Sequence, residues 1–175
     1  MTQMEDHDAG RLIGVHHTSF TVGDMGRSLR FYRDTLGLTV IADWQPQEAY
    51  LGAITGYPGA RLHIAYLQLA PYSEHVLELI QYLEPRGQPQ ADLSTNRPGV
   101  AHLCFQVDDL AAVYERLRRA GVPFRSPGPV PITGGPNRGG FAVYLRDPDG
   151  VTLELIQRVS SPTPSPSPSP ADRGA

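Results

Sequence analysis

The chain shows two kinds of hydrophobic pattern, and the same series of patterns occurs twice. In two stretches, apolar residues recur at helical spacing between an aspartate that can cap a helix and a glycine that can end it. Asp24 and Gly37 bound the first stretch, and Asp109 and Gly121 bound the second. The remaining apolar runs are short, as in β-strands. We expect strands at residues 13–22, 38–44, 61–69, 75–82, 100–107, 123–125, 141–146 and 151–158.

A repeated pentapeptide indicates that the two series are copies of one unit. Leu-Glu-Leu-Ile-Gln stands at residues 77–81 and again at 153–157, in the last expected strand of each half. Each half therefore has the order strand, helix, strand, strand, strand, and we predict an α+β fold. The expected segments are a disordered N-terminus at 1–10, a first βαβββ module at 11–83, a linker at 84–98, a second βαβββ module at 99–158 and a disordered Ser/Pro tail at 159–175.

Composition limits the class of protein without identifying it. The net charge of −3 argues against nonspecific nucleic-acid binding, which needs a basic surface to neutralise phosphates. No apolar run approaches the length needed to cross a bilayer, so we expect no membrane association. The N-terminal residues lack the basic start and apolar stretch of a secretory signal, and Cys104 is the only cysteine. We therefore expect a cytoplasmic location.

One histidine and one glutamate in each half carry the candidate chemistry. Because strand residues alternate sides, the apolar neighbours of His17 and His102 face the helix of their half, and each histidine faces away from it. Glu78 and Glu154 each stand between leucines, where a carboxylate is costly unless it is paired or binds a metal. A single strand histidine is usually structural, but here the same pattern recurs in register with the duplicated unit. Two His and two Glu suit one divalent ion, such as Zn, Ni, Co, Mn or Fe.

At these residues the sequence resembles the vicinal-oxygen-chelate superfamily, which contains glyoxalase I, methylmalonyl-CoA epimerase, extradiol dioxygenases and bleomycin resistance proteins. The run from His17 to Gly37 is similar to the opening of glyoxalase I, and the run from Gly99 to Asp109 is closer to the second half of the epimerase. The closing run from Tyr144 to Glu154 is general to the superfamily. The resemblance covers about residues 12–157 and is more specific for the superfamily than for a reaction.

The resemblance implies a cupped eight-stranded mixed sheet with helices outside. One metal would lie in the cup, held by the four residues His17, Glu78, His102 and Glu154. The resemblance also favours a homodimer, since paired modules expose sheet edges that can join across a two-fold axis. Whether the four ligands come from one chain or from two is left open. Thr21 stands where glyoxalase I commonly has an arginine that helps to hold glutathione, which weighs against the glutathione hemithioacetal as substrate.

The expected activity is that of a lyase, isomerase or epimerase acting on a small substrate with two adjacent oxygens. The metal would polarise the substrate carbonyl and stabilise an enediolate. Glu78 or Glu154 would be the base, as the glyoxalase resemblance suggests. Two alternatives stay open: an Fe(II)-dependent dioxygenase that uses the same cup, and an antibiotic-resistance binding protein without turnover. The retained ligand set weighs against the binding protein.

Further candidate residues lie in a loop at 126–140 and among polar strand residues. The loop is rich in glycine and proline, and it could form a lid whose Asn137 and Arg138 contact the substrate; a plain surface loop is the alternative. The other side chains that could line the site are Glu48, Tyr50, Arg61, His63, Tyr66 and Tyr144, and strand alternation does not select among them. We expect His16 to lie on the helix side with a structural role, and Cys104 to be a pocket-wall residue rather than a nucleophile.

Overall fold

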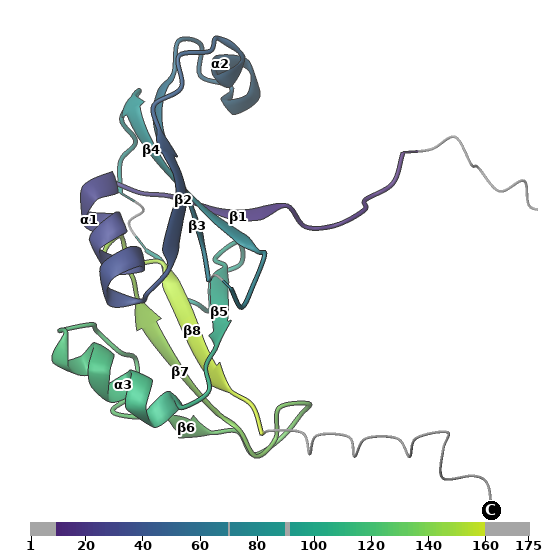
Figure 1. The fold of residues 1–175 in the computed structure, drawn as a ribbon, viewed down its shortest axis with the longest axis vertical. Helices are drawn as coiled ribbons and strands as arrows, with labels where there is room; N and C mark the ends of the chain where they lie inside the picture. Colours follow the sequence, from purple (N-terminus) through teal and green to yellow (C-terminus); the bar gives the residue numbers. More distant parts are fainter. Residues whose placement is uncertain (1–9, 70, 90–91, 160–175) are drawn as a thin grey trace, which may run out of the picture. The chain divides into compact units, whose positions relative to one another are not determined.

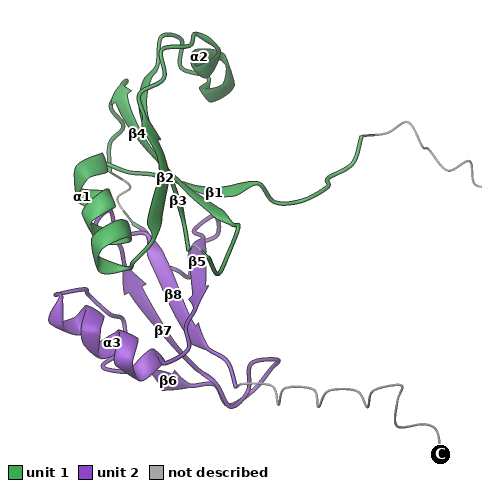
Figure 2. Cartoon of the chain, in the orientation of Figure 1, with its two compact units in different colours: residues 1–92 green, residues 93–175 purple. Residues whose placement is uncertain are grey.

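The computed structural model describes residues 10–69, 71–89 and 92–159. The two segments expected to be disordered, 1–10 and 159–175, lie almost entirely outside these ranges. The chain divides into two compact units, Met1–Asp92 (unit 1) and Leu93–Ala175 (unit 2), as Figure 2 shows. The division falls inside the segment expected to be the linker.

Unit 1 contains one four-stranded mixed sheet. Its elements are β1 (His17–Thr21), α1 (Met25–Leu29), its π-helical continuation η1 (Arg30–Thr35), β2 (Thr39–Trp44), α2 (Tyr50–Thr55), β3 (Arg61–Gln68) and β4 (Val76–Glu84). The strand order is β1-β4-β3-β2 (Figure 1). β1 runs parallel to β4, and the other neighbouring strands are antiparallel.

Unit 2 repeats this arrangement. Its elements are β5 (His102–Gln106), α3 (Leu110–Arg119), β6 (Val130–Pro131), β7 (Phe141–Arg146) and β8 (Thr152–Gln157), and its sheet has the order β5-β8-β7-β6. The parallel pair is again formed by the first and last strands. The two units confirm the predicted α+β fold of two βαβββ modules, with the eight strands in two four-stranded sheets. Their combination into a single cup stays a prediction.

Elements in both units differ from the sequence-based expectation. The strand expected at 123–125 is reduced to a single bridge between Phe124 and Leu145, and the edge strand of unit 2 is β6. Pro123 and Pro127 flank that bridge and provide no backbone N–H, so a longer ladder cannot form there. The short helix α2 was not expected. It is stabilised mainly by tertiary packing rather than by local propensity, since Leu51 packs in a buried cluster with strand residues Leu62 and Ile64.

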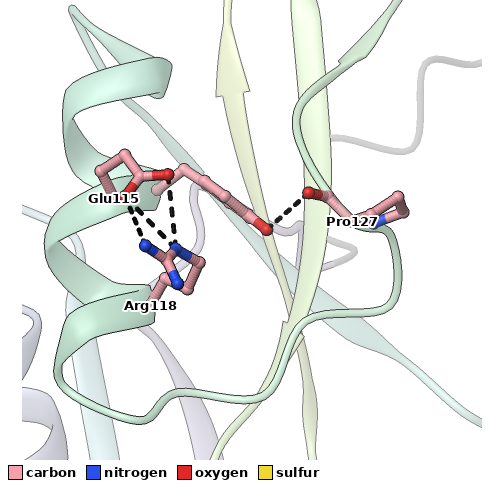
Figure 3. A network of polar contacts seen from close by, with 4 residues as sticks. Glu115, Arg118 and Pro127 are labelled. Atoms are coloured by element: carbon pink, nitrogen blue, oxygen red, sulfur yellow. Dashed lines mark hydrogen bonds and ion pairs between the residues drawn. The ribbon is translucent and has the colours of Figure 1, made fainter.

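The helices begin where the capping aspartates predict. The Asp24 carboxylate accepts a hydrogen bond from the backbone N–H of Arg27, and that of Asp109 accepts one from Ala112. Beyond its cap, α3 is held by the Tyr114 hydroxyl, which donates a hydrogen bond to the Pro127 carbonyl at 2.8 Å. On the exposed side of the same helix, Arg118 and Glu115 form an ion pair at 3.0 Å (Figure 3).

The glutamine that ends the repeated pentapeptide ties each helix to its own sheet. Gln81 Oε1 accepts a hydrogen bond from the backbone N–H of Met25 at 3.0 Å, and Gln157 Oε1 accepts one from Leu110 at 2.8 Å. Met25 and Leu110 are the first residues of α1 and α3, whose N–H groups have no acceptor within the helix. The duplicated Gln thus performs the same structural role in both modules.

Replacing Gln157 by alanine should lower the free energy of unfolding by about 1–2 kcal/mol, because the Leu110 N–H loses its acceptor. Urea denaturation measures the change. Gln106→Ala is the matched control, since Gln106 is an exposed residue of the same sheet, and it should cost less than about 0.5 kcal/mol. Equal losses in the two variants would contradict a special role for Gln157.

Candidate metal centre

His17 and Glu78, the two residues that the sequence selects in unit 1, lie together on one face of its sheet. Ser19 of β1 stands opposite Glu78 of the parallel strand β4, and His17 is two residues earlier on the same side. His17 Nε2 is 3.3 Å from Glu78 Oε2. Glu78 is only 8% exposed, so its carboxylate needs partners in place of water.

The corresponding pair in unit 2 has the same arrangement. Cys104 of β5 stands opposite Glu154 of β8, and His102 Nε2 is 3.1 Å from Glu154 Oε2. The Glu154 side chain is 18% exposed, compared with 10% for that of Glu78. The duplicated unit therefore forms the same histidine–carboxylate pair twice, with the second pair closer to solvent.

The geometry of both pairs fits two adjacent ligands of one metal ion. Metal–nitrogen and metal–oxygen bonds of about 2.1 Å that meet at about 90–110° place their donor atoms about 3.0–3.4 Å apart. The observed N···O distances of 3.1 and 3.3 Å fall in this range. Among the described residues, no group of three or more His, Cys, Asp or Glu side chains is close enough to hold a metal. Each pair by itself therefore provides two possible ligands.

A tyrosine stands beside each of the two carboxylates. Tyr66 of β3 is the cross-strand partner of Glu78, and Tyr144 of β7 is the partner of Glu154. Burial, the charge of Glu78 and a hydrogen bond to it raise the pKa of Tyr66. Burial, the charge of Glu154 and the neighbouring Cys104 raise the pKa of Tyr144. Strand register thus distinguishes these two from the other strand residues among the six polar candidates.

Cys104 is an exposed residue whose thiol is shifted toward the protonated form. Burial, the negative charge of Glu154 and a hydrogen bond to that carboxylate raise the pKa of Cys104 to about 12. A thiol with this pKa is protonated at neutral pH and is a poor nucleophile. This supports the interpretation of Cys104 as a wall residue beside the pair of unit 2.

His16 is placed differently from the sequence-based expectation. It was expected on the helix side with a structural role, but it is exposed, and its Nδ1 lies 2.8 Å from Nδ1 of His17. The reason is that β1 begins at His17, so the alternation of the strand does not extend to His16. His16 therefore contacts a candidate metal ligand.

The remaining strand candidates have other partners. His63 Nε2 lies 2.6 Å from Asp43 Oδ1, and Arg61 forms an ion pair with Glu84 at 3.1 Å. His63 pairs across the strands with Gln81, the residue that reaches the helix, so it lies on the face away from Glu78. The contacts of His63 and Arg61 are therefore structural and do not involve the histidine–carboxylate pair of unit 1.

The loop that carries Asn137 and Arg138 is a hydrogen-bonded turn in unit 2. Backbone bonds of 2.8 Å join Gly139 to Ile132 and Ile132 to Gly140. The turn leads into Phe141, which pairs with Gln157 of β8. Gln157 is three positions, or about 10 Å, along β8 from Glu154. The loop therefore adjoins the end of the sheet, and its closure over the pair as a lid stays a prediction.

Comparison with known proteins identifies similar sequences and folds. The family described as the Glyoxalase/Bleomycin resistance protein/Dioxygenase superfamily matches residues 14–155. The probable chloroplastic lactoylglutathione lyase of Arabidopsis thaliana is 31% identical over 150 residues, which cover 83% of this chain and 36% of that protein. The lactoylglutathione lyase of Haemophilus influenzae is 28% identical over 84% of this chain and 94% of its own length. This chain spans between a third and a half of the plant relatives that it matches.

Solved structures show the same fold. A glyoxalase family protein from Bacillus cereus superposes with a TM-score of 0.74 at 18% identity, covering 87% of this chain and 98% of that one. In the described part of this chain, no helix has the length and apolar character needed to span a bilayer.

Proposed function

Because this chain belongs to the glyoxalase/bleomycin resistance protein/dioxygenase superfamily, we propose that it is a glyoxalase-like enzyme that depends on a divalent metal. It would act as a lyase, isomerase or epimerase on a small substrate with two adjacent oxygens. The observation that carries the proposal is the duplicated histidine–carboxylate pair, His17 with Glu78 and His102 with Glu154, each with the spacing of two metal ligands.

The four side chains of the two pairs would hold one ion. Imidazole and carboxylate ligands suit Zn, Ni, Co, Mn or Fe, and two carboxylates offset the charge of the ion. These four residues would leave the ion open to the adjacent oxygens of a substrate. When bound, the ion supplies Lewis-acid polarisation of the substrate carbonyl. The two pairs would meet within one chain or across a homodimer, which exposed sheet edges favour.

Of the two carboxylates, Glu154 is the better candidate for the base. Its side chain is more exposed than that of Glu78, and a thiol, a weak hydrogen-bond donor, is its neighbour on β5. Glu154 would take the proton from the carbon next to the substrate carbonyl and return it to the substrate, without an oxidant or a reductant. Glu78, buried and hydrogen-bonded by Tyr66, would remain a ligand.

The names of the relatives suggest the first substrate to test, and Thr21 of this chain suggests the second. Relatives named lactoylglutathione lyase make the glutathione hemithioacetal the first substrate to test. Thr21, exposed at the end of β1, replaces the arginine expected to help hold glutathione, so a hemithioacetal of a smaller thiol is the second. Asn137 and Arg138 stay proposed contacts for an anionic part of the substrate.

The proposed reaction class predicts turnover without oxygen. A two-His, two-Glu set differs from the usual iron oxygenase site of two His and one carboxylate, because the second carboxylate occupies a position that dioxygen needs. With Zn, Ni or Co and an active substrate, activity should persist under nitrogen, and a carbon-bound proton should exchange with solvent. NMR of the product formed in D₂O measures the exchange. Activity seen only with Fe(II), with one dioxygen consumed per turnover, would instead support the dioxygenase.

A further inference from the structure

We propose that Tyr66 is a positioning residue that holds the carboxylate of Glu78 in the orientation needed to bind the metal. Its counterpart Tyr144 does not have this role at Glu154. The inference rests on the proposed metal site and concerns how this chain builds one half of it.

Tyr66 adjoins both members of the pair in unit 1. Glu78 is its cross-strand neighbour, and burial, the charge of that carboxylate and a hydrogen bond to it raise the pKa of Tyr66. Its ring stacks on His17 with centroids 6.3 Å apart and an interplanar angle of 28°. On another side the ring meets Trp44 edge-on, with centroids 5.1 Å apart. A ring held by two aromatic neighbours keeps its hydroxyl at a defined place.

A fixed phenol matters because the Glu78 carboxylate is buried. An ionised carboxylate accepts several hydrogen bonds and rotates when water is its only partner. At 8% exposure, few waters reach Glu78, so the phenol takes the place of a water donor. With one part of the carboxylate held by Tyr66, Oε2 faces Nε2 of His17 at 3.3 Å. Prior orientation of a ligand raises metal affinity, because binding then orders fewer groups.

The second module provides an internal comparison. Tyr144 occupies the same cross-strand position beside Glu154, but its ring is tilted by 46° to His102 instead of stacking on it. Glu154 stands opposite Cys104 of β5 and is the more exposed carboxylate. At the place equivalent to Cys104, unit 1 has Ser19. The two modules have therefore diverged in how the carboxylate is held, although the His, Glu and Tyr are retained in both.

The test is the metal affinity of Tyr66→Phe, measured on the full chain with Co²⁺ or Zn²⁺ by competition with a chromophoric chelator. The substitution removes only the hydroxyl, so the metal-free chain should stay folded, with a small fall in melting temperature from the lost hydrogen bond. Affinity should fall by about tenfold or more, as for other partners that orient metal ligands. The visible spectrum of the Co²⁺ form should also change, because Glu78 would bind in another orientation. Tyr144→Phe should cause a much smaller loss.

Tyr82→Phe is the control for packing. Tyr82 is half-buried on the same strand and face as Glu78, and its ring packs on the Leu51 cluster. Equal losses in Tyr66→Phe and Tyr82→Phe would overturn the inference, as would an unchanged affinity and Co²⁺ spectrum in Tyr66→Phe. If the unsubstituted chain binds neither metal, the proposed metal site itself fails, and the inference fails with it.

Discussion

His102→Ala should bind a divalent ion at least about 100-fold more weakly than the unsubstituted chain. The loss of a metal ligand should lower metal affinity at least as much as the loss of a group that only orients a ligand. The unsubstituted chain should hold one ion for each set of four ligands, which is one His17–Glu78 pair together with one His102–Glu154 pair. His102 Nε2 and Glu154 Oε2 are 3.1 Å apart, so removing the imidazole leaves its partner as a single isolated ligand in unit 2. Since metal binding stabilises the folded state, the variant should also lose the rise in melting temperature that added metal produces.

Three matched variants interpret this result. His17→Ala should have the same effect as His102→Ala if both pairs bind one ion. If only one of these two variants loses metal, the ion binds only in the unit that contains the substituted histidine. His75→Ala should bind metal normally, because His75 is an exposed histidine whose Nε2 contacts the Thr18 hydroxyl at 3.0 Å. Metal analysis of protein purified without added metal is the measurement, and undiminished occupancy in both His102→Ala and His17→Ala would contradict the ligand assignment.

The second large effect concerns catalysis. Glu154→Gln should lower kcat by about 10²–10⁴-fold on any substrate that the enzyme turns over, which is the usual contribution of a general base. Glutamine keeps the size of the side chain and an oxygen that can bind the metal, but it cannot accept the proton. Metal occupancy should therefore persist in this variant, which separates the loss of the base from the loss of the ion.

Glu78→Gln is the matched comparison for the base. Glu78 is the more buried carboxylate and is hydrogen-bonded by Tyr66, and we propose that it acts only as a ligand. This variant should therefore keep far more activity than Glu154→Gln when both are saturated with metal. The reverse order, with Glu78→Gln inactive and Glu154→Gln active, would assign the base to Glu78. Steady-state rates of Glu154→Gln and Glu78→Gln, measured at equal metal occupancy, show which carboxylate is the base.

The sequence by itself determined the architecture of each module and the four candidate ligands. Helix starts at Asp24 and Asp109 are local, since a capping side chain acts on residues three positions away. The repeated pentapeptide marked the duplication. Strand alternation then set Glu78 and Glu154 apart from the leucines on either side. The helix starts and the α+β fold are confirmed, and each depends on patterns that the sequence itself contains. The assignment of the four ligands stays a prediction.

Only the tertiary structure decided which side chains meet across strands. Nothing along the chain distinguishes Tyr66 and Tyr144 from the other polar candidates, because cross-strand neighbours depend on hydrogen-bond register between strands that are distant in sequence. The helix α2 depends on the packing of Leu51 against strand residues, which no local pattern contains. The 3.1 and 3.3 Å spacings of the two pairs likewise arise from the parallel pairing of the first and last strand of each module.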